Sequence, residues 1–570
     1  MLLSVVLVIG MLSVPAFAAS GSTSLSGVSF YVEANEEVGL QSNIKVDMST
    51  VTGVGTIYLP GSVDPEKVFL SWDNSNVTVS KGSTSYNSGE VPIPSADGSI
   101  RYKVKKGALI KYYTFKTYQG SADVEPMFLE LNEELGTIKA MNSDSDHETS
   151  CYGTAKIGDV DGAISIKGRG NSTWIMPKKP YNITFYKNDE YAKKVKVSLV
   201  DGVKAKKWTL LANYFDTSLI RNKIALDLAN DMEIGLESKF VDLWMNGEYL
   251  GNYLLTPKKD YNTPDDGYFL ENDHQPIENE EEQFEFPNIH VMPLKHNIIN
   301  VDIGDDAADA GENLETVKAW FTEAWNAVLD YDSEDYQNYF DMESWAKMFL
   351  MFEVSKTYDC YAGNILMHRD GLTASDKLYA GPAWDYDIAF GRTLHKFLVG
   401  VTEPMQLNAE GWYNESIGYS VVDEPVSILQ GLGRHESFMK KVAEVYNENI
   451  AAFEAIDGNI TKQTELVRDS AMMNYKKYKL ALSAEYVVSP TIMSLLGTGK
   501  YRLNYKITTD WDSFIYNLRE FCSKRTMWLT DNLQMDNTAD ETTVDQASVE
   551  EESVETVSEE ESVEQVPSDN

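Results

Sequence analysis

The chain has 570 residues, of which 43% are hydrophobic, and this length exceeds what one hydrophobic core usually supports. We therefore expect two folded domains with appended segments. The formal net charge is −39, from 88 acidic and 49 basic residues. This charge argues against a nucleic-acid-binding protein, because phosphate backbones are bound by clustered Lys and Arg, and it suits a basic protein partner better.

Residues 1–18 are typical of a secretory signal peptide. An apolar run from Leu2 to Leu12 is followed by Val14-Pro15-Ala16-Phe17-Ala18, which has the small-x-small pattern of a cleavage site. The usual basic residues before the run are missing, so a buried helix or a membrane anchor is the alternative. No later stretch is apolar and long enough to span a bilayer. We predict a secreted or cell-surface bacterial protein without a transmembrane span in its mature form.

Residues 19–122 predict a small β-sandwich of the immunoglobulin-like kind. Short segments of alternating polarity, such as Val28–Val32 and Val68–Trp72, are separated by turns rich in Asn, Gly, Ser and Pro. Nothing in this region suggests catalysis, and its expected role is that of a spacer or an adhesive module.

Residues 123–533 mix strands and helices, which predicts an α+β domain. Asn246-Gly247 suits a type I′ turn between two short strands. Apolar residues at helical spacing predict helices over 314–328, after Asn313 as a cap, and over 345–352, after Asp341. Asp216 is expected to cap the helix that begins near Arg221, and Arg221 is expected to form a salt bridge that ties this helix to an acidic loop.

Residues 534–570 form an acidic tail. From Asp536 onward this tail contains thirteen acidic residues and no basic ones, so we expect it to be disordered. The chain's three cysteines, Cys151, Cys360 and Cys522, are too few for a disulfide framework.

Phosphoryl transfer is the chemistry suggested by residues 358–391. Asp359 and Asn364 reproduce the Asp-x-x-x-x-Asn interval of a kinase catalytic loop, and Asp385 follows where a metal-binding Asp is expected. In such a loop one carboxylate accepts the proton of the attacking hydroxyl, while a second carboxylate and an amide oxygen hold Mg²⁺. If residues 384–387 are extended, Asp385 and Asp387 lie on one face.

Two other interpretations of this region were weighed. The Asp-x-x-x-x-Asn interval occurs by chance in many proteins, and Asp359 could simply end a helix. His368-Arg369-Asp370 spells a kinase triplet, but Ser375, not Asn, lies five residues beyond it, and Asp370-Gly371 looks like a hairpin turn. We reject this triplet as the catalytic loop.

A second candidate for phosphate binding is a glycine-containing loop. Its residues are Gly168, Arg169, Gly170, Asn171 and Ser172, and Lys178 and Lys179 follow downstream. Paired glycines permit close backbone approach to phosphate, and a lysine on a strand could neutralise its charge. Thr173 replaces the third glycine of the usual motif, so an ordinary tight turn with exposed lysines is the alternative.

Five segments together resemble one known family. They are Gly168–Ser172 with Pro177–Tyr181, then Leu219–Asn222, Asn246–Tyr253, Gly267–Glu271, and Gly381–Asp387 with Phe390-Gly391. In order and spacing they are similar to the spore coat protein H (CotH) family over roughly 123–533. This family comprises secreted or spore-associated atypical protein kinases, so the resemblance implies an atypical protein-kinase-like fold that phosphorylates Ser residues of proteins with Mg²⁺ and ATP.

The resemblance also implies roles for individual residues. Asp359 would be the catalytic Asp, and Asn364 and Asp385 would hold Mg²⁺. Lys179 would contact phosphate, with Lys178 as its rival, and residues 168–172 would cover the nucleotide. Asp387 is either a second metal ligand or a structural acceptor, and Glu271 is either the partner of the nucleotide-site lysine or a surface strand residue.

Three functions follow from these observations. The first is an exported protein kinase acting on Ser or Thr, and the second is a cell-surface adhesin or scaffold with a kinase-like fold. The third is another nucleotide-dependent modification, such as adenylylation. The presence of Asp359, Asn364 and Asp385 together favours catalysis, because a scaffold needs none of them. The sequence does not identify the substrate, the anchor, the source of ATP or the oligomeric state.

Overall fold

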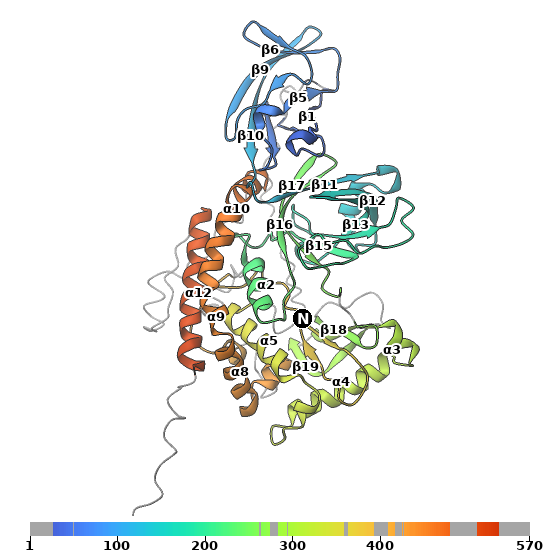
Figure 1. The fold of residues 1–570 in the computed structure, drawn as a ribbon, viewed down its shortest axis with the longest axis vertical. Helices are drawn as coiled ribbons and strands as arrows, with labels where there is room; N and C mark the ends of the chain where they lie inside the picture. The colour runs from blue at the N-terminus through green and yellow to red at the C-terminus, as the bar shows by residue number, and fades with distance from the viewer. Residues whose placement is uncertain are drawn as a thin grey trace, which may run out of the picture.

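The computed structural model describes residues 25, 27–49, 51–261, 264–273, 283–292, 295–357, 363–392, 408–416, 425, 427–478 and 510–534. The predicted signal peptide and most of the predicted acidic tail lie outside these residues. Figure 1 shows a β-rich module at the top, a β-barrel in the middle and a helical lobe with a further sheet below. The chain is therefore of the mixed α+β class that the sequence predicts.

The N-terminal module consists of two sheets that share one core. Phe30, Trp72 and Phe115 lie at its centre, where the ring centroids of Phe30 and Phe115 are 5.3 Å apart. This arrangement confirms the predicted sandwich of sheets. One sheet has the order β2-β1-β5-β8 and the other the order β3-β4-β10-β9-β6-β7. The strands are β1 (Phe30–Val32), β2 (Ile44–Lys45), β3 (Asp47–Met48), β4 (Val54–Leu59), β5 (Phe69–Trp72), β6 (Val77–Lys81), β7 (Thr84–Tyr86), β8 (Val91–Pro92), β9 (Ser99–Lys106) and β10 (Leu109–Gln119).

The middle layer is a closed barrel with the strand order β11-β12-β13-β14-β15-β17-β16. Its strands are β11 (Glu125–Leu131), β12 (Ser150–Ile157), β13 (Val160–Gly168), β14 (Tyr181–Tyr186), β15 (Lys207–Leu211), β16 (Lys239–Met245) and β17 (Glu248–Pro257). Asn246 and Gly247 join β16 to β17 with φ values of 48° and 77°. Two successive positive φ values define the predicted type I′ turn, which is therefore confirmed.

The N-terminal module is fixed to the outside of this barrel. Tyr58 stacks on Tyr249 with their ring centroids 4.9 Å apart, and the backbone amide of Lys45 donates to the carbonyl of Gly247 at 2.9 Å. The backbone amide of Ser121, in the short link between β10 and β11, donates to Ser470 Oγ at 2.9 Å. Ser470 lies on the long helix α10 (Ile456–Tyr478), whose upper end reaches the module in Figure 1.

The lower lobe combines helices with a sheet of order β19-β20-β18-β21-β22. Its helices are α2 (Arg221–Asp231), α3 (Asp305–Asp309), α4 (Leu314–Leu329), α5 (Met342–Ser355), α6 (Tyr413–Ser416), α7 (Ile428–Leu432), α8 (Glu436–Glu448), α9 (Ile450–Glu454), α10 and α12 (Trp511–Leu533), and α1 (Ile138–Ser143) belongs to the barrel region. Its strands are β18 (Tyr268–Asp273), β19 (Gln283–Met292), β20 (Lys295–Ile303), β21 (Ile365–Arg369) and β22 (Tyr379–Ala380).

Both helices predicted in this lobe are confirmed with their caps. Asn313 Oδ1 accepts from the backbone amides of Glu315 and Thr316 at the start of α4. Asp341 Oδ1 accepts from the backbone amide of Ser344 at the start of α5. These bonds satisfy amide groups that the first helical turn leaves without partners. Among the described residues, no helix has the length and apolar character that a membrane crossing requires.

A buried ion pair joins the two central helices α5 and α12. Arg525 Nη2 lies 2.6 Å from Glu353 Oε2, and both side chains are inaccessible to solvent. Arg525 Nη1 also donates to the carbonyl of Ala409, and Glu353 accepts from the backbone amides of Tyr413 and Asn414. The pair thus fixes residues 409–414 against both helices.

Replacing Arg525 with Met should destabilise the protein strongly. The substitution leaves the Glu353 carboxylate buried without its cation, which costs about 3 to 5 kcal/mol for comparable pairs. Urea unfolding followed by tryptophan fluorescence measures this loss, and the double variant Arg525→Met/Glu353→Met should recover much of it. A loss below about 1 kcal/mol in the single variant would show that the pair does not hold the helices together.

Candidate functional site

Three polar residues gather at one end of the five-stranded sheet. Glu271 lies near the carboxyl end of β18, Asn364 immediately precedes β21, and Asp385 follows β22. β18 pairs with β21 through Glu271 and Leu366, and β21 pairs with β22 through Met367 and Ala380. Because both pairs are antiparallel, the end of β18, the start of β21 and the end of β22 lie at the same edge of the sheet.

The loop that carries Asp385 is not extended. Asp385 has a φ of 64°, in the left-handed region, and residues 381–386 belong to no strand. Residues 384–387 are therefore not a strand, and the condition under which Asp385 and Asp387 would lie on one face by alternation is not met. A left-handed residue turns the chain sharply, and Asp or Asn tolerates this conformation better than bulkier residues do. Asp385 is partly buried, whereas Asp387 is buried.

The N-terminus of α2 holds this loop in place. The backbone amide of Tyr386, next to Asp385, donates to Asn222 Oδ1 at 2.6 Å. Arg221 Nε donates to the carbonyl of Ala389 at 2.9 Å. The side chains of the two adjacent residues at the start of one helix therefore fix both ends of residues 386–389.

Arg221 is held in turn by a buried ion pair. Its Nη1 atom lies 2.7 Å from Asp216 Oδ1, and Asp216 Oδ2 accepts from the backbone amide of Arg221 at 2.8 Å. Asp216 Oδ1 also accepts from the backbone amide and the hydroxyl of Ser218. Asp216 accepts from the first backbone amide of α2, although Ile220 occupies the N-cap position. Arg221 forms the expected salt bridge, and its partner is Asp216, which the sequence did not single out for that role. The sequence did not indicate that Arg221 of this pair also contacts the loop of Asp385, through the carbonyl of Ala389.

Charged side chains from three elements surround Asp385. Burial raises the pKa of its carboxyl group, Arg169 and Lys259 oppose this shift, and Glu271 adds to it. Lys259, just after β17, forms an ion pair with Glu271 on β18. The cluster formed by Arg169, Lys259, Glu271 and Asp385 therefore contains two cations and two carboxylates, and we call it the charged cluster.

The glycine-containing loop reaches this cluster through Arg169. The guanidinium of Arg169 lies 5.6 Å from the ring centroid of Trp384, the residue before Asp385. Gly170 has a φ of 79°, and a Cβ atom at Gly168 would lie 2.4 Å from the Trp174 ring, so both positions require glycine. Asn171 and Ser172 follow in the turn between β13 and β14 and are exposed.

The two lysines singled out from the sequence are both bonded to backbone carbonyls. Lys178 is 1% exposed, donates from Nζ to the carbonyl of Asn252 and lies over the Tyr253 ring. Lys179 donates from Nζ to the carbonyl of Trp174 and lies 4.3 Å from the centroid of that ring. A phosphate contact by either amine would require these bonds to break.

Sequence reasoning missed Lys259 and left the partner of Glu271 open. The structure supplies that partner, since Lys259 and Glu271 are paired within the charged cluster. Lys259 stands in the sequence Pro257-Lys258-Lys259-Asp260, where two adjacent lysines resemble an ordinary surface loop. Only the position of Glu271, in a motif already singled out, could have prompted a search for a cation near it.

A cavity of about 510 Å³ adjoins the charged cluster, because Lys259 lines it. Phe269, His368 and Tyr379 form one wall, and Ile234, Gly235 and Gly381 belong to its lining as well. The volume is within the usual range for sites that bind small molecules. His368 and Asp370 of the rejected triplet lie here, with His368 stacked on Tyr379. The strands β21 and β22 are joined by residues 370–378, so the expected tight turn at Asp370-Gly371 is wrong.

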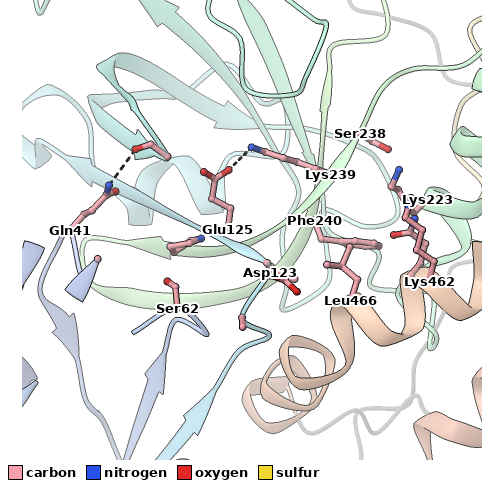
Figure 2. A pocket seen from close by; sticks show the side chains of 16 residues that line it. Gln41, Ser62, Asp123, Glu125, Lys223, Ser238, Lys239, Phe240, Lys462 and Leu466 are labelled. Atoms are coloured by element: carbon pink, nitrogen blue, oxygen red, sulfur yellow. Dashed lines mark hydrogen bonds and ion pairs between the residues drawn. The ribbon is translucent and has the colours of Figure 1, made fainter. Parts of the chain in front are cut away.

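A second cavity, of about 660 Å³, lies where the N-terminal module, the barrel and α10 meet. Figure 2 shows Lys239 paired with Glu125 on its barrel side, and Lys223 and Lys462 together on its helical side. None of the residues predicted for catalysis or nucleotide binding lines it. The same is true of the smaller cavity, but Lys259 of the charged cluster lines it, so we place the candidate active site at the charged cluster and that cavity.

Asp359, the predicted catalytic Asp, lies outside the described residues. Among those described, no three His, Cys, Asp or Glu side chains are grouped so that they could hold a metal ion. Asn364, Asp385 and Asp387 remain predictions as metal ligands, as do residues 168–172, Lys178 and Lys179 as nucleotide ligands. The side-chain oxygens of Asn364, Asp385 and Asp387 are of the kind that Mg²⁺ prefers as ligands. Burial disfavours the charged form of the Asp385 carboxylate, so a nearby cation would stabilise it.

Comparison with known protein families shows to which family the chain belongs. Residues 166–529 match the family described as CotH kinase protein, which covers well over half of the chain. This chain belongs to the CotH kinase family. No curated protein matches it. Membership suggests atypical kinase activity and implies the use of ATP, and the resemblance stated from the sequence is confirmed.

The CotH kinase match begins within β13 and ends within α12. It therefore includes the glycine-containing loop, the charged cluster, the helix α2 and the loop of Asp385. The N-terminal sheets precede it, and so do β11 and β12 of the barrel. The barrel is thus completed by two strands from outside the matched residues, which ties the N-terminal region to the kinase fold.

Lys178 should make the stability of this CotH kinase depend on pH. Burial lowers the pKa of its amine to about 7, and the Asp242 carboxylate opposes that shift. Between pH 7 and pH 10 the unfolded chain then binds one more proton at this site than the folded chain does. The free energy of unfolding should therefore rise with pH, by up to about 1.4 kcal/mol per unit.

Urea unfolding at pH 7, 8 and 9 tests this, with Lys178→Met as the comparison. The variant should lack the part of the rise that Lys178 contributes, so the difference in stability between the two proteins should change with pH. Lys187→Met, at an exposed lysine just after β14, is the matched control. A difference between wild type and Lys178→Met that stays constant across this range would contradict the assignment of a buried, largely neutral amine.

Proposed function

We propose that this protein is an exported kinase that transfers the γ-phosphoryl group of ATP to Ser or Thr hydroxyls of other proteins. The charged cluster carries the proposal. A lysine paired with a glutamate, next to a partly buried aspartate and an arginine from a glycine-containing loop, is the arrangement that phosphoryl transfer requires, because this chemistry depends on positioning and charge stabilisation.

In this proposal Lys259 binds the phosphates and Glu271 orients it. The ion pair fixes the amine at the edge of the 510 Å³ cavity, where a nucleotide can lie. Arg169 adds a second positive charge from the loop above. Two cations that converge on one point suit a triphosphate better than a neutral ligand.

Asp385 and Asn364 are proposed to hold Mg²⁺, which would neutralise charge on the β- and γ-phosphates when bound. The loop that bears Asp385 is suited to this role because Asn222 and Arg221 fix its backbone. Asp387 is proposed as a structural acceptor, since it is buried and lies within the segment that α2 holds. Asp359 is proposed to accept the proton of the attacking hydroxyl.

The proposed protein substrate and the proposed export of the enzyme are inferred from the sequence. A protein substrate with basic segments suits the net charge of −39, and export rests on the apolar residues 2–12 with the cleavage pattern that follows. No nucleic-acid substrate is proposed. The two alternatives are a scaffold without turnover and an enzyme that transfers the adenylyl group.

Labelled ATP distinguishes these functions. The mature protein is incubated with Mg²⁺, a mixture of secreted proteins and ATP labelled on either the γ- or the α-phosphate. Label transferred from the γ position alone to Ser or Thr supports the kinase. Label transferred from the α position would indicate adenylylation, and the absence of both transfer and nucleotide binding would indicate a scaffold. Lys259→Met should weaken ATP binding, while Lys318→Met, at an exposed lysine of α4, is the control.

Replacing Asp385 with Asn should lower the rate of transfer by about 100-fold or more, because a charged ligand of the metal is lost. Asp387→Asn should retain most of the activity and instead lower the melting temperature. Transfer rates at saturating ATP, together with thermal unfolding, measure both effects. Equal activity of wild type and Asp385→Asn would refute the assignment of Asp385 as a metal ligand. Loss of activity in Asp387→Asn without a change in melting temperature would indicate that Asp387 is a metal ligand.

A further inference from the structure

Three adjacent strands of the N-terminal module have a charge opposite to that of the whole protein. β6 has one basic residue, β9 has four and β10 has two, and none of the three strands contains Asp or Glu. The chain as a whole has 88 acidic and 49 basic residues. These neighbouring strands, with seven basic residues and no acidic one, are therefore a local exception to the acidic charge of the whole chain.

The strand register places three of these seven basic residues, all on β9, on one face. Lys103 lies opposite Tyr112 on β10 and Ser80 on β6, and Arg101 lies opposite Thr114. Tyr102, Val104, Tyr113 and Phe115, the alternate residues, are buried in the module core. Since strand side chains alternate, the outer face carries Thr78, Arg101, Lys103, Lys105, Tyr112 and Thr114, and we call it the basic face.

The basic face is open although the rest of the same sheet surface is covered. Nearer the barrel, Lys476 of α10 lies over Tyr118, and Tyr249 stacks on Tyr58. Farther along the strands, Tyr112 is 55% exposed and its neighbour Ile110 is 48% exposed. The guanidinium of Arg101 lies 5.0 Å from the centroid of the Tyr112 ring. Within the described part of the chain, Arg101, Lys103 and Lys105 form no ion pair.

We propose that the basic face binds an acidic polysaccharide. Arg101, Lys103 and Lys105 occupy alternate positions of one strand, so their Cα atoms repeat at roughly 7 Å intervals along it, and the Arg101 guanidinium lies over the ring of Tyr112, the residue opposite Lys103. A linear polymer with regularly spaced carboxylates can match such a row. The exposed Tyr112 ring offers a flat surface to the C–H face of a sugar, and the hydroxyls of Thr78 and Thr114 offer hydrogen bonds to its OH groups.

The shape of the face favours an extended ligand over a small one. It is an open sheet surface, and the two cavities described above are lined by other residues. Single-stranded nucleic acid is less suitable, because its binding surfaces stack successive bases on several aromatic rings, and Tyr112 is the one exposed aromatic side chain among these three strands. The inference goes beyond the proposed kinase function and does not depend on it.

The net charge of the protein does not prevent this binding. Charges in physiological salt are screened over about 8 to 10 Å, so the acidic residues of the lower lobe contribute little at the module. In Figure 1 the strands β6 and β9 lie at the end of the molecule opposite that lobe. A local cluster can therefore attract a polyanion that the average charge would repel.

Binding of the mature protein to a fluorescent oligogalacturonate of defined length tests the proposal. The triple variant Arg101→Glu/Lys103→Glu/Lys105→Glu should bind at least about tenfold more weakly and should show a smaller dependence on salt. Tyr112→Ala should weaken binding about threefold or more through loss of ring contact. The matched control is Lys187→Glu/Lys193→Glu/Lys196→Glu, which makes the same change in charge at exposed lysines of the barrel and should leave binding unchanged.

Two further ligands separate the alternatives. A neutral malto-oligosaccharide of equal length should bind weakly or not at all, and an oligothymidylate of equal charge should bind more weakly than the acidic glycan. Equal affinity of wild type and the first triple variant would overturn the proposal, as would tighter binding of the oligothymidylate or an absence of binding to the acidic glycan. Melting temperatures of all variants confirm that each one is folded.

Discussion

The buried ion pair between Asp216 and Arg221 is the interaction on which the candidate site depends. It costs desolvation energy, which is offset by the hydrogen bonds that Asp216 accepts from backbone amides and that Arg221 donates to a backbone carbonyl. The pair fixes the first turn of α2, and that turn holds residues 386–389 through Arg221 and Asn222. A carboxylate that is to bind a metal ion must sit on a rigid backbone, because small displacements of a ligand weaken binding. The position of Asp385 is therefore set by groups that do not belong to the site themselves.

The lysines of this protein divide into structural and site-forming ones by their surroundings. Lys178 is buried, and its amine donates a hydrogen bond to the backbone carbonyl of Asn252 in the barrel. Burial lowers the pKa of this amine to about 7. Lys259 lies at the rim of a cavity and is paired with Glu271, which orients it. Type and spacing alone cannot separate these two roles, because both lysines stand next to a second lysine in the sequence.

The N-terminal module shows that net charge describes a protein poorly at the scale of a binding surface. The chain is strongly acidic, yet one face of the module carries a row of cations and an exposed tyrosine. Salt screens charges over short distances, so the charge on the surface of one strand can differ in sign from the net charge of the protein. The sequence interpretation treated this module as a spacer or an adhesive module because nothing in it suggests catalysis. Its pairing register, however, is what separates the charged face from the apolar one.

The sequence by itself determined the elements whose signals are local. The sandwich of sheets, the type I′ turn at Asn246-Gly247 and the caps of α4 and α5 follow from residues a few positions apart, and the family follows from motifs in a fixed order. Only the tertiary structure decided that Asp385 adopts a left-handed conformation, that Lys259 rather than a lysine near Gly168 pairs with Glu271, and that the basic residues of β9 share an open face. These features depend on contacts between segments distant in the chain, and the free energy of such contacts is set by packing and burial, which no short stretch of sequence contains.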